Sequence, residues 1–493
     1  MTEKYFDRFR KNIIGLDQTF TGPYGEKKIV YADWTASGRM YGPIEHRITH
    51  DIAPFVGNTH TETTVTGSSM TKAYHHAKEI IKKHVNANET DILISSCSGM
   101  TGVVNKLQRI LGLKLHEKMR KKIDIPQSER PIVFVTHMEH HSNQTTWLET
   151  ICDVMVIQAC NEGCVDLDHF QQLLEKFSDR LTKIAAVTSC SNVTGIQTPY
   201  HEIAKMIHKV GGHCFVDFAC SGPYIDIDMH PTDPEEKIDA IYFSPHKFLG
   251  GPSSSGILIF CQSLYDNKIP DNPGGGTVDW TNPWGEHKYY DSIEAREDGG
   301  TPSFIQTIRV ALCVQLKDEM GVENILHREH QLMRPVWNRL SKVDNLHILA
   351  DNLKDRLAVF SFYIQDLHFN LAVKLLNDRY GIQVRGGCSC AGTYGHYLLQ
   401  VTNEKSKSIT DLINLGDNSN KPGWIRMSLH PTMTDAEIEY LISAIEELCE
   451  HHKEWMQDYE YNKHKNEFYH KSGIKVEDSI IKDWFTIRDM EIA

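Results

Sequence analysis

A lysine that follows an apolar run is the first candidate for chemistry. Lys247 stands in "YFSPHKFLGGPSSSGILIF", after a β-branched and aromatic segment and just before two glycines. A lysine at a strand end beside a cleft loses water, which lowers its pKa and frees the amine to form a Schiff base. The alternative is a solvated loop lysine, and Lys247 taken alone favours that alternative.

A carboxylate ends another apolar run. In "CFVDFACS", Asp217 closes a segment whose other residues are apolar, so its charge requires a cationic partner. The protonated ring nitrogen of an electron-sink cofactor is such a partner. The alternative is an aspartate that caps the N-terminus of a helix.

A glycine turn follows a third run. "SSCSGMTGVVNKL" leads from a strand through Ser98, Gly99, Met100 and Thr101 into a helix. Free backbone N–H groups and a hydroxyl at a helix N-terminus can hold a phosphate. An ordinary capped helix start is the alternative.

Two further polar residues follow predicted strands. His140 in "THMEHHSNQTTW" can lie flat on an aromatic ring and relay protons near neutral pH, and Asn192 in "TSCSNVTG" can donate to a phenolate oxygen. Each of them, taken singly, is equally well explained as a satisfied loop residue.

Two cysteines stand one residue apart in "VRGGCSCAGTYGH". Cys388 and Cys390 follow Arg385 and a glycine pair, which brings cationic, flexible and nucleophilic residues together. The alternative is a plain turn with cysteines acting as small buried hydrophobes.

The elements that must position these residues form a regular series. The runs "DILISS", "PIVFVTH", "IAAVTS", "HCFVDFA", "AIYFSP" and "SGILIF" alternate with helical patterns. Continuous apolar strands separated by helices predict a mostly parallel sheet covered on both faces, and ligands of such sheets gather at the carboxyl ends of the strands. We therefore expect an α/β fold with the site in the middle of the chain.

From about Gly299 the pattern changes to a long helical stretch followed by mixed strands and helices, which predicts a smaller α+β domain. Its last long helix opens with Thr434 and Glu437 as a capping box. The predicted boundaries are an N-terminal segment at 1–28 that packs with the small domain, a large domain at 29–305, the small domain at 306–452 and a C-terminal extension at 453–493.

The composition excludes several classes of function. The chain has 493 residues with 52 Lys plus Arg against 65 Asp plus Glu, a formal charge of −13, which argues against nucleic-acid binding. Its first residues lack an apolar signal region, and no segment is long enough to span a bilayer.

The cysteines and histidines give no metal pattern. The 12 cysteines are scattered without the paired spacing of zinc sites or a dense disulfide framework, so a reducing cytoplasm fits best. The 27 histidines lack companions at metal-ligand spacing. We therefore expect no metal site.

Together these segments resemble a known family. "YADWTASG", "NTHTE", "GMTGVVN", "MEHHSN", "SNVTG", "VDFACS", "FSPHK", "GGGT", "EDGGTPS", "VRGGCSCA" and "RMSLHPT" occur in the order found in fold-type I, class V pyridoxal phosphate enzymes. The resemblance runs from Tyr31 to about Leu448, and the most similar group is that of the cysteine desulfurases and selenocysteine lyases. It implies a fold of that type with a mostly parallel seven-stranded sheet.

The resemblance also implies roles for individual residues. Lys247 would be the Schiff-base lysine, Asp217 the partner of the pyridine nitrogen, His140 the stacking residue that relays protons, and Asn192 a contact to the phenolic oxygen. The other cofactor and substrate positions would be Gly99, Met100, Thr101, Ser244, His246 and Cys220 for pyridoxal 5′-phosphate, with Arg426, Arg385, Thr35 and Ala36 for the substrate. Thr277 in "GGGT" would reach the phosphate of a second subunit, which implies a homodimer.

The same resemblance places the nucleophile at Cys390. Its thiolate would attack the sulfur (or selenium) of cysteine (or selenocysteine), leaving alanine and a persulfide that an acceptor protein could receive.

Some positions depart from the family pattern. Cys220 stands where a glutamine is expected, and Met100 replaces a common threonine. Trp34 and Thr35 replace small residues of the family's N-terminal "D-x-A-A-T" pattern, a change that we expect to reshape the substrate pocket. The segment between Cys390 and Arg426 is longer than usual. Cys388 is a further departure, either a spectator, a resolving thiol or itself the nucleophile.

Three functions remain open from the sequence. The first is desulfuration of cysteine; the second is another class V reaction, such as transamination, epimerisation or β-elimination, that does not use Cys390; the third is a non-catalytic protein that has kept the fold.

Overall fold

A seven-stranded sheet, in the order β4-β10-β9-β8-β7-β5-β6, forms the centre of the larger part of the molecule. The computed structural model describes residues 3–59, 61–96 and 98–486. The strands are β4 (Ile92–Ser96), β5 (Ile132–Thr136), β6 (Asp153–Ile157), β7 (Lys183–Thr188), β8 (His213–Asp217), β9 (Ala240–Phe243) and β10 (Gly256–Phe260). Only β10 runs antiparallel to its neighbours, β4 and β9. The predicted α/β fold with a mostly parallel seven-stranded sheet is confirmed.

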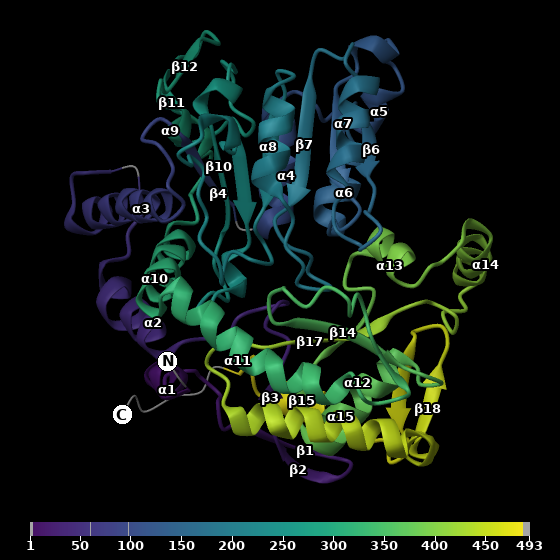
Figure 1. Ribbon diagram of the computed structural model, residues 1–493. Helices are drawn as coiled ribbons and strands as arrows, with labels where there is room; N and C mark the ends of the chain where they lie inside the picture. Colours follow the sequence, from purple (N-terminus) through teal and green to yellow (C-terminus); the bar gives the residue numbers. More distant parts are fainter. Residues whose placement is uncertain (1–2, 60, 97, 487–493) are drawn as a thin grey trace.

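Helices cover both faces of this sheet (Figure 1). Successive side chains of a strand point to opposite faces, so Phe134 packs into one core cluster while Val133 and Val135 pack into the other. Burial on both faces explains why the strands read as continuous apolar runs. The covering helices are α3 (Val65–His84), α4 (Gly99–Ile110), α6 (His141–Leu148), α7 (Leu167–Lys176), α8 (Tyr200–His208) and α10 (Phe304–Met320).

A second, antiparallel sheet with the order β13-β14-β17-β16 lies in the lower half of Figure 1. Its strands are β13 (Leu346–Ile348), β14 (Val359–Ile364), β16 (Arg385–Gly387) and β17 (Trp424–Ser428), and its helices are α11 (Val322–Leu340), α12 (Phe369–Tyr380) and α15 (Asp435–Trp455). Thr434 and Glu437 cap α15 reciprocally, which confirms the predicted capping box.

The N-terminal segment lies against this smaller part. Arg10 forms an ion pair of 2.7 Å with Glu437 of α15. The segment contains α1 (Glu3–Arg10), β1 (Thr19–Gly22), β2 (Gly25–Lys28) and β3 (Val30–Tyr31), and β3 pairs in parallel with β15 (Ile382–Gln383). The predicted boundaries between the domains stay predictions.

The remaining elements are short or lie in insertions. They are α2 (Gly42–His46), α5 (Glu117–Arg120), α9 (Ile293–Glu297), β11 (Val278–Thr281), β12 (His287–Tyr289), α13 (Gly392–Leu398), α14 (Asn403–Asn414), β18 (Tyr459–Asn462), β19 (Glu467–His470) and α16 (Val476–Ile481). The polar segment between Cys390 and Arg426 thus holds two helices. Across the described ranges, no helix combines the length and the apolar character needed to cross a bilayer.

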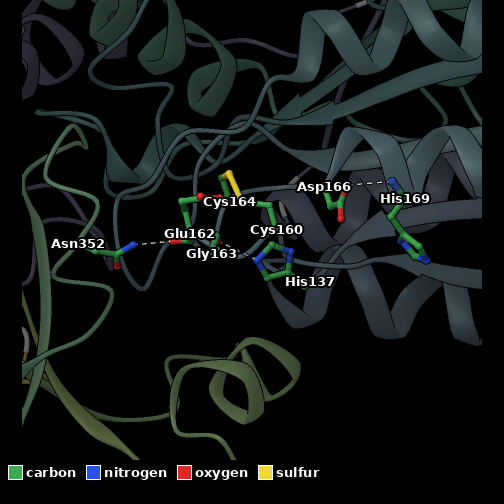
Figure 2. The surroundings of a disulfide bond; sticks show 8 residues. All are labelled: His137, Cys160, Glu162, Gly163, Cys164, Asp166, His169 and Asn352. Atoms are coloured by element: carbon green, nitrogen blue, oxygen red, sulfur yellow. Dashed lines mark hydrogen bonds between the residues drawn. A yellow bond between two sulfur atoms is a disulfide. The ribbon is translucent and has the colours of Figure 1, made fainter.

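A disulfide that the sequence analysis did not anticipate closes a turn after β6. Cys160 and Cys164 are joined, and Figure 2 shows the bond beside Glu162 and Gly163. His137 lies 3.3 Å, by its Nε2, from the Gly163 carbonyl oxygen, so the turn is fixed to the segment that leads to His140. Disulfides are uncommon in a reducing cytoplasm, which leaves the predicted location an expectation.

One glycine sets the position of the segment that carries Lys247. A 3₁₀ turn, η5 (Pro245–Lys247), follows β9, and the Gly38 N–H donates to the His246 carbonyl oxygen at 2.9 Å. A Cβ atom at position 38 would lie 1.9 Å from the Phe248 carbonyl oxygen. Only glycine therefore permits this approach.

Replacing that glycine should disturb the fold where the lysine is held. We expect Gly38→Ala to lower the free energy of unfolding by about 1–3 kcal/mol, because the backbone at 246–248 must move to admit a methyl group. Denaturant unfolding of the variant and of Gly42→Ala, whose added Cβ would lie at an ordinary 3.4 Å from its nearest neighbour, measures the difference. Equal stability of the two variants would contradict this account.

Candidate functional site

A cavity of about 270 Å³ lies where the carboxyl ends of β7, β8 and β9 face β16 and β17 of the smaller sheet. It brings together nearly all of the residues that the sequence analysis assigned to a site: Thr35, Ala36, Gly99, Met100, Thr101, His140, Asn192, Asp217, Cys220, Ser244, His246, Lys247, Arg385, Cys390 and Arg426. Ser98, from the same predicted turn, also lines the cavity, together with residues that were not predicted: Ser142, Thr188, Cys190, Ala219 and Ser389.

Lys247 enters the cavity from η5. Its desolvation lowers the pKa of the amine, although the neighbouring Cys220 and Asp217 oppose the shift. A lowered pKa increases the share of neutral amine, which is the nucleophilic form. The side chain keeps some accessible surface because it lines the cavity.

Asp217 ends β8 and is buried, with 2 % of its surface exposed. Its Oδ1 accepts a hydrogen bond of 2.7 Å from the Ala219 N–H. Within the described residues neither oxygen forms an ion pair, and burial raises the pKa of the carboxyl to about 6. A cationic N–H group in the cavity would remove this desolvation cost.

His140 forms the N-cap of α6. Its Nδ1 accepts a hydrogen bond of 3.1 Å from the Ser142 N–H. Burial, followed by the charge of Lys247, lowers the pKa of the ring to about 3, so the imidazole is neutral at physiological pH. A neutral ring can stack on a ligand, but with a pKa near 3 it does not relay protons near neutral pH as the sequence led us to expect.

The start of α4 offers donors to an anion. Gly99 has φ of +62°, and the Met100 N–H lies 3.2 Å from Ser244 Oγ. Thr101 Oγ1 lies 2.7 Å from Ser142 Oγ. The side chain of Met100 is packed in the hydrophobic core that α4 shares with the sheet. This position therefore presents only its backbone N–H group, where a threonine would add a hydroxyl.

A carboxylate that sequence reasoning missed joins the two arginines. Arg385 and Arg426 are directly opposite each other on β16 and β17, where like charges repel. Asp33 Oδ1 lies 2.8 Å from Arg426 Nη2, and its Oδ2 lies 3.0 Å from Arg385 Nε. Asp33 lies within the segment "YADWTASG", two residues before the predicted substrate residue Thr35, so its place in the sequence was a signal for a role at the site.

The loop with Cys390 is held in an uncommon conformation. Ser389 and Cys390 have φ of +51° and +56°, a backbone region that residues other than glycine rarely adopt. The His141 N–H donates to the Cys390 carbonyl oxygen at 2.7 Å, and Asn192 Nδ2 donates to the Ser389 carbonyl oxygen at 2.7 Å. Cys390 is exposed and lines the cavity.

Cys388 faces elsewhere. It lines a separate apolar cavity of about 150 Å³ together with Leu399, Ile409, Ile413 and Trp424. The two cysteines of the motif therefore occupy different surroundings.

Two departures from the expected pattern, Cys220 and Trp34, are both buried. Cys220 is buried beside Cys190, and its thiol is 3.7 Å from the Ser191 carbonyl oxygen, so it offers only a weak donor to the cavity. Trp34 is stacked on His430 with ring centroids 4.0 Å apart. The indole of Trp34 is part of the core, whereas Thr35 lines the cavity, so of these two positions Thr35 is the one in direct contact with the site.

Comparison with known proteins places this geometry in a family. A family model described as "Aminotransferase class-V" matches residues 30–441. The chain belongs to the class-V aminotransferase family. Among curated proteins, it is 30% identical over 262 residues to a cysteine desulfurase of Haloferax volcanii, covering 52% of this chain and 59% of that protein.

Other relatives of this class-V chain cover more of its length. A probable cysteine desulfurase of Halalkalibacterium halodurans is 26% identical over 76% of this chain and 86% of its own length. Among solved structures, an apo cysteine desulfurase from Thermococcus onnurineus is 21% identical with a TM-score of 0.70, covering 90% of this chain and 98% of the other. The cysteine desulfurase CsdA from Escherichia coli is 20% identical with a TM-score of 0.69 and the same coverage. These structures share the fold.

The cavity of this class-V enzyme fits the cofactor that the family resemblance implied. Buried polar atoms without a protein partner among the described residues include Thr35 Oγ1, Asn192 Oδ1 and Arg426 Nε. With the unpaired Asp217 and the donors at the start of α4, they suit a ligand that carries a phosphate, a ring cation and a carboxylate. Pyridoxal 5′-phosphate with an amino acid has these groups.

Thr277 does not line this cavity. It is buried, and its Oγ1 donates to the Gly274 carbonyl oxygen at 2.6 Å within the turn before β11. Its role toward a second subunit stays a prediction.

Removing the charge of Asp33 should destabilise the fold around Arg385 and Arg426. We expect Asp33→Asn to lower the free energy of unfolding by about 3 kcal/mol, because Arg426 would be buried beside Arg385 without its counter-charge. Asp17→Asn removes the partner of Lys28 in an exposed ion pair and should leave stability unchanged, so it is the control. Denaturant unfolding compares the two, and a stable Asp33→Asn would contradict the assignment.

Proposed function

We propose that this chain is a pyridoxal phosphate-dependent, cysteine desulfurase-like enzyme. It removes sulfur (or selenium) from L-cysteine (or selenocysteine) and yields alanine and a persulfide on Cys390. The observation that carries the proposal is the presence of Lys247, Asp217, Arg426 and Cys390 around one cavity. The names of the relatives, cysteine desulfurases, support the same reaction.

Each end of the substrate has a candidate partner. Pyridoxal phosphate, when bound, supplies an electron sink that stabilises negative charge on the substrate carbons. Arg426 would bind the substrate carboxylate, since its guanidinium is fixed by Asp33 and by the Asn192 carbonyl oxygen at 3.1 Å while Nε stays without a partner. Lys247, as a neutral amine, would hold the cofactor and then move the proton of the substrate α-carbon.

The sulfur step uses Cys390. Its thiolate attacks the substrate sulfur, an S–S bond forms as the bond between that sulfur and the β-carbon breaks, and a proton delivered to the β-carbon completes alanine. In the neutral ring of His140, Nδ1 accepts the Ser142 N–H, so Nε2 carries the hydrogen and can donate a hydrogen bond to a ligand in the cavity. Because Cys390 is exposed, the persulfide would stand where an acceptor protein can reach it.

Assembly is part of the proposal. A homodimer would let Thr277 reach the phosphate bound by the other subunit, as the family resemblance implies. The cytoplasm remains the proposed location.

The cofactor assignment predicts an effect on stability that does not depend on turnover. Asp217 has a pKa near 6 in the fold against 3.8 without burial, so its folded form binds more protons between those values. Stability of the cofactor-free protein should therefore fall as pH rises through that window, by about 3 kcal/mol at most. We expect Asp217→Asn to remove this contribution and to stabilise cofactor-free protein at pH 7.

Thermal unfolding of cofactor-free wild type and Asp217→Asn between pH 4 and pH 8 measures the slope. The same variant should bind pyridoxal phosphate weakly, as judged by the cofactor absorbance after dialysis. Glu139 and Glu329 also have pKa values raised to about 8 by burial, so both proteins should lose stability with rising pH and the Asp217 contribution is the difference between the two curves. Identical pH profiles would contradict the role of Asp217.

The reaction is tested by separating the two cysteines of the motif. With L-cysteine as substrate, we expect Cys390→Ala to lower alanine formation at least 100-fold and to lose the bound persulfide, because the attacking sulfur is gone. Cys388→Ala is the matched control and should keep most of the activity. Product analysis by mass spectrometry measures both.

Borohydride treatment gives the complementary result. It should fix the cofactor onto Lys247 in wild type and in Cys390→Ala, but not in Lys247→Ala. Full alanine formation by Cys390→Ala would favour a class V reaction that does not use this thiol, and the absence of any trapped cofactor would favour a non-catalytic protein.

A further inference from the structure

Three donor side chains of different chemistry converge at the other end of the large sheet. Asp91 precedes β4, Cys261 follows β10, and His230 lies in the connection between β8 and β9. In the antiparallel ladder Phe260 pairs with Ile92, so Cys261 and Asp91 continue the same register. One ligand atom from each of the three lies within 4.8 Å of the others.

The three side chains are held firmly. Asp91 Oδ2 lies 2.7 Å from His230 Nε2 and accepts a second hydrogen bond of 2.7 Å from the Asn88 N–H. The Asp91 side chain is 3 % exposed and that of His230 is 20 % exposed. Cys261 is buried, and its thiol makes a long hydrogen bond of 4.0 Å to the Ile238 carbonyl oxygen.

The donor set matches the preference of one cation. An imidazole nitrogen, a thiolate and a carboxylate are the ligands of Zn²⁺ in proteins, and together they neutralise its charge. Tetrahedral coordination at about 2.0–2.1 Å from nitrogen and oxygen requires the Asp91 and His230 atoms to separate by roughly 0.6 Å. The exposed side of His230 leaves access for water as a fourth ligand.

The charges around this group are already balanced. Lys237, which faces Cys261 and Asp91, is paired with Asp239 at 3.2 Å, and Asp239 also contacts His208 at 2.7 Å and His213 at 3.8 Å. Burial, followed by the carboxylate of Asp91, raises the pKa of the Cys261 thiol to about 12. A bound divalent cation reverses that effect, because a coordinating thiol is deprotonated.

We propose that Asp91, His230 and Cys261 form a structural binding site for Zn²⁺. The ion would join the start of β4, the end of β10 and the β8–β9 connection. Since β4 and β10 reach the catalytic cavity with their opposite ends, five residues or about 16 Å away, the ion would not touch the reacting groups. The second cluster, Cys160 with Glu162 and Cys164, lacks free thiols because the two sulfurs are bonded to each other.

Cobalt is the probe for this site, because tetrahedral Co²⁺ absorbs at long visible wavelengths, where pyridoxal phosphate does not. Holoenzyme without a histidine tag is freed of metal by a chelator and titrated with Co²⁺. We expect one equivalent with tetrahedral, thiolate-containing absorption, displaced by Zn²⁺, and a rise in the unfolding temperature with Zn²⁺. Cys261→Ser and His230→Gln should each weaken binding at least tenfold and lose that spectrum.

A matched control separates this site from other thiols. Cys152→Ser alters a partly buried free thiol elsewhere and should bind Co²⁺ like wild type. Circular dichroism checks that the variants fold. If Cys261→Ser does not fold, His230→Gln decides the test, because the His230 side chain is partly exposed and its replacement should be tolerated. Failure of wild type to take up one equivalent, or an unchanged spectrum in His230→Gln, would overturn the proposal, whatever the outcome for cysteine desulfuration.

Discussion

The candidate site depends on two ionisable groups, Lys247 and Asp217, that are desolvated and form no ion pair with each other among the described residues. Asp217 ends β8, and Lys247 lies in the turn after the neighbouring strand β9. Burial raises the pKa of Asp217 and lowers that of Lys247, so it favours the neutral form of each group. Such a pair is costly to keep, so the surrounding fold must prevent the lysine from turning away or the carboxylate from reaching solvent. The Gly38 contact to the segment after β9 and the Ala219 N–H bond to Asp217 do this on either side. A ligand with a ring cation and an aldehyde satisfies both groups at once.

The smaller sheet contributes two arginines to the cavity and so gives it a surplus of positive charge. Three cationic side chains, Lys247, Arg385 and Arg426, meet two carboxylates, Asp217 and Asp33, which leaves an excess of one positive charge when all are ionised. Asp33 is placed between the arginines and therefore limits their mutual repulsion without occupying all of their donors. The remaining donors and the N-terminus of α4 favour anionic groups, so carboxylate and phosphate are drawn to different ends of one cavity.

The sequence predicted the sheet and most of the cavity because strand ends carry local signals. A buried parallel strand is a continuous apolar run, and a polar residue directly after it must lie at the edge where ligands bind. Asp33 was missed because its meaning depends on Arg426, 393 residues away. The low pKa of His140 was missed for the same reason, since burial arises only in three dimensions. The disulfide between Cys160 and Cys164 joins cysteines only four residues apart, and it was missed because the sequence analysis looked for the spacing of zinc sites and dense disulfide frameworks.

The spacing of the two cysteines in the sequence does not show that they lie in different surroundings, which only the fold reveals. In extended backbone, residues i and i+2 face the same side, but the left-handed conformation of Ser389 and Cys390 turns the chain. Cys390 therefore lines the polar cavity, while Cys388 lies among Leu399, Ile413 and Trp424. To exchange their places, the loop would have to give up the bonds that His141 and Asn192 make to it and the bond from Trp424 Nε1 to Ser389 Oγ at 3.2 Å. Those bonds also hold Ser389 and Cys390 in the left-handed region, so the strain is matched by contacts on both sides. The path of the backbone therefore gives Cys390, and not Cys388, access to the polar cavity, and Cys388 packs against apolar side chains in this arrangement.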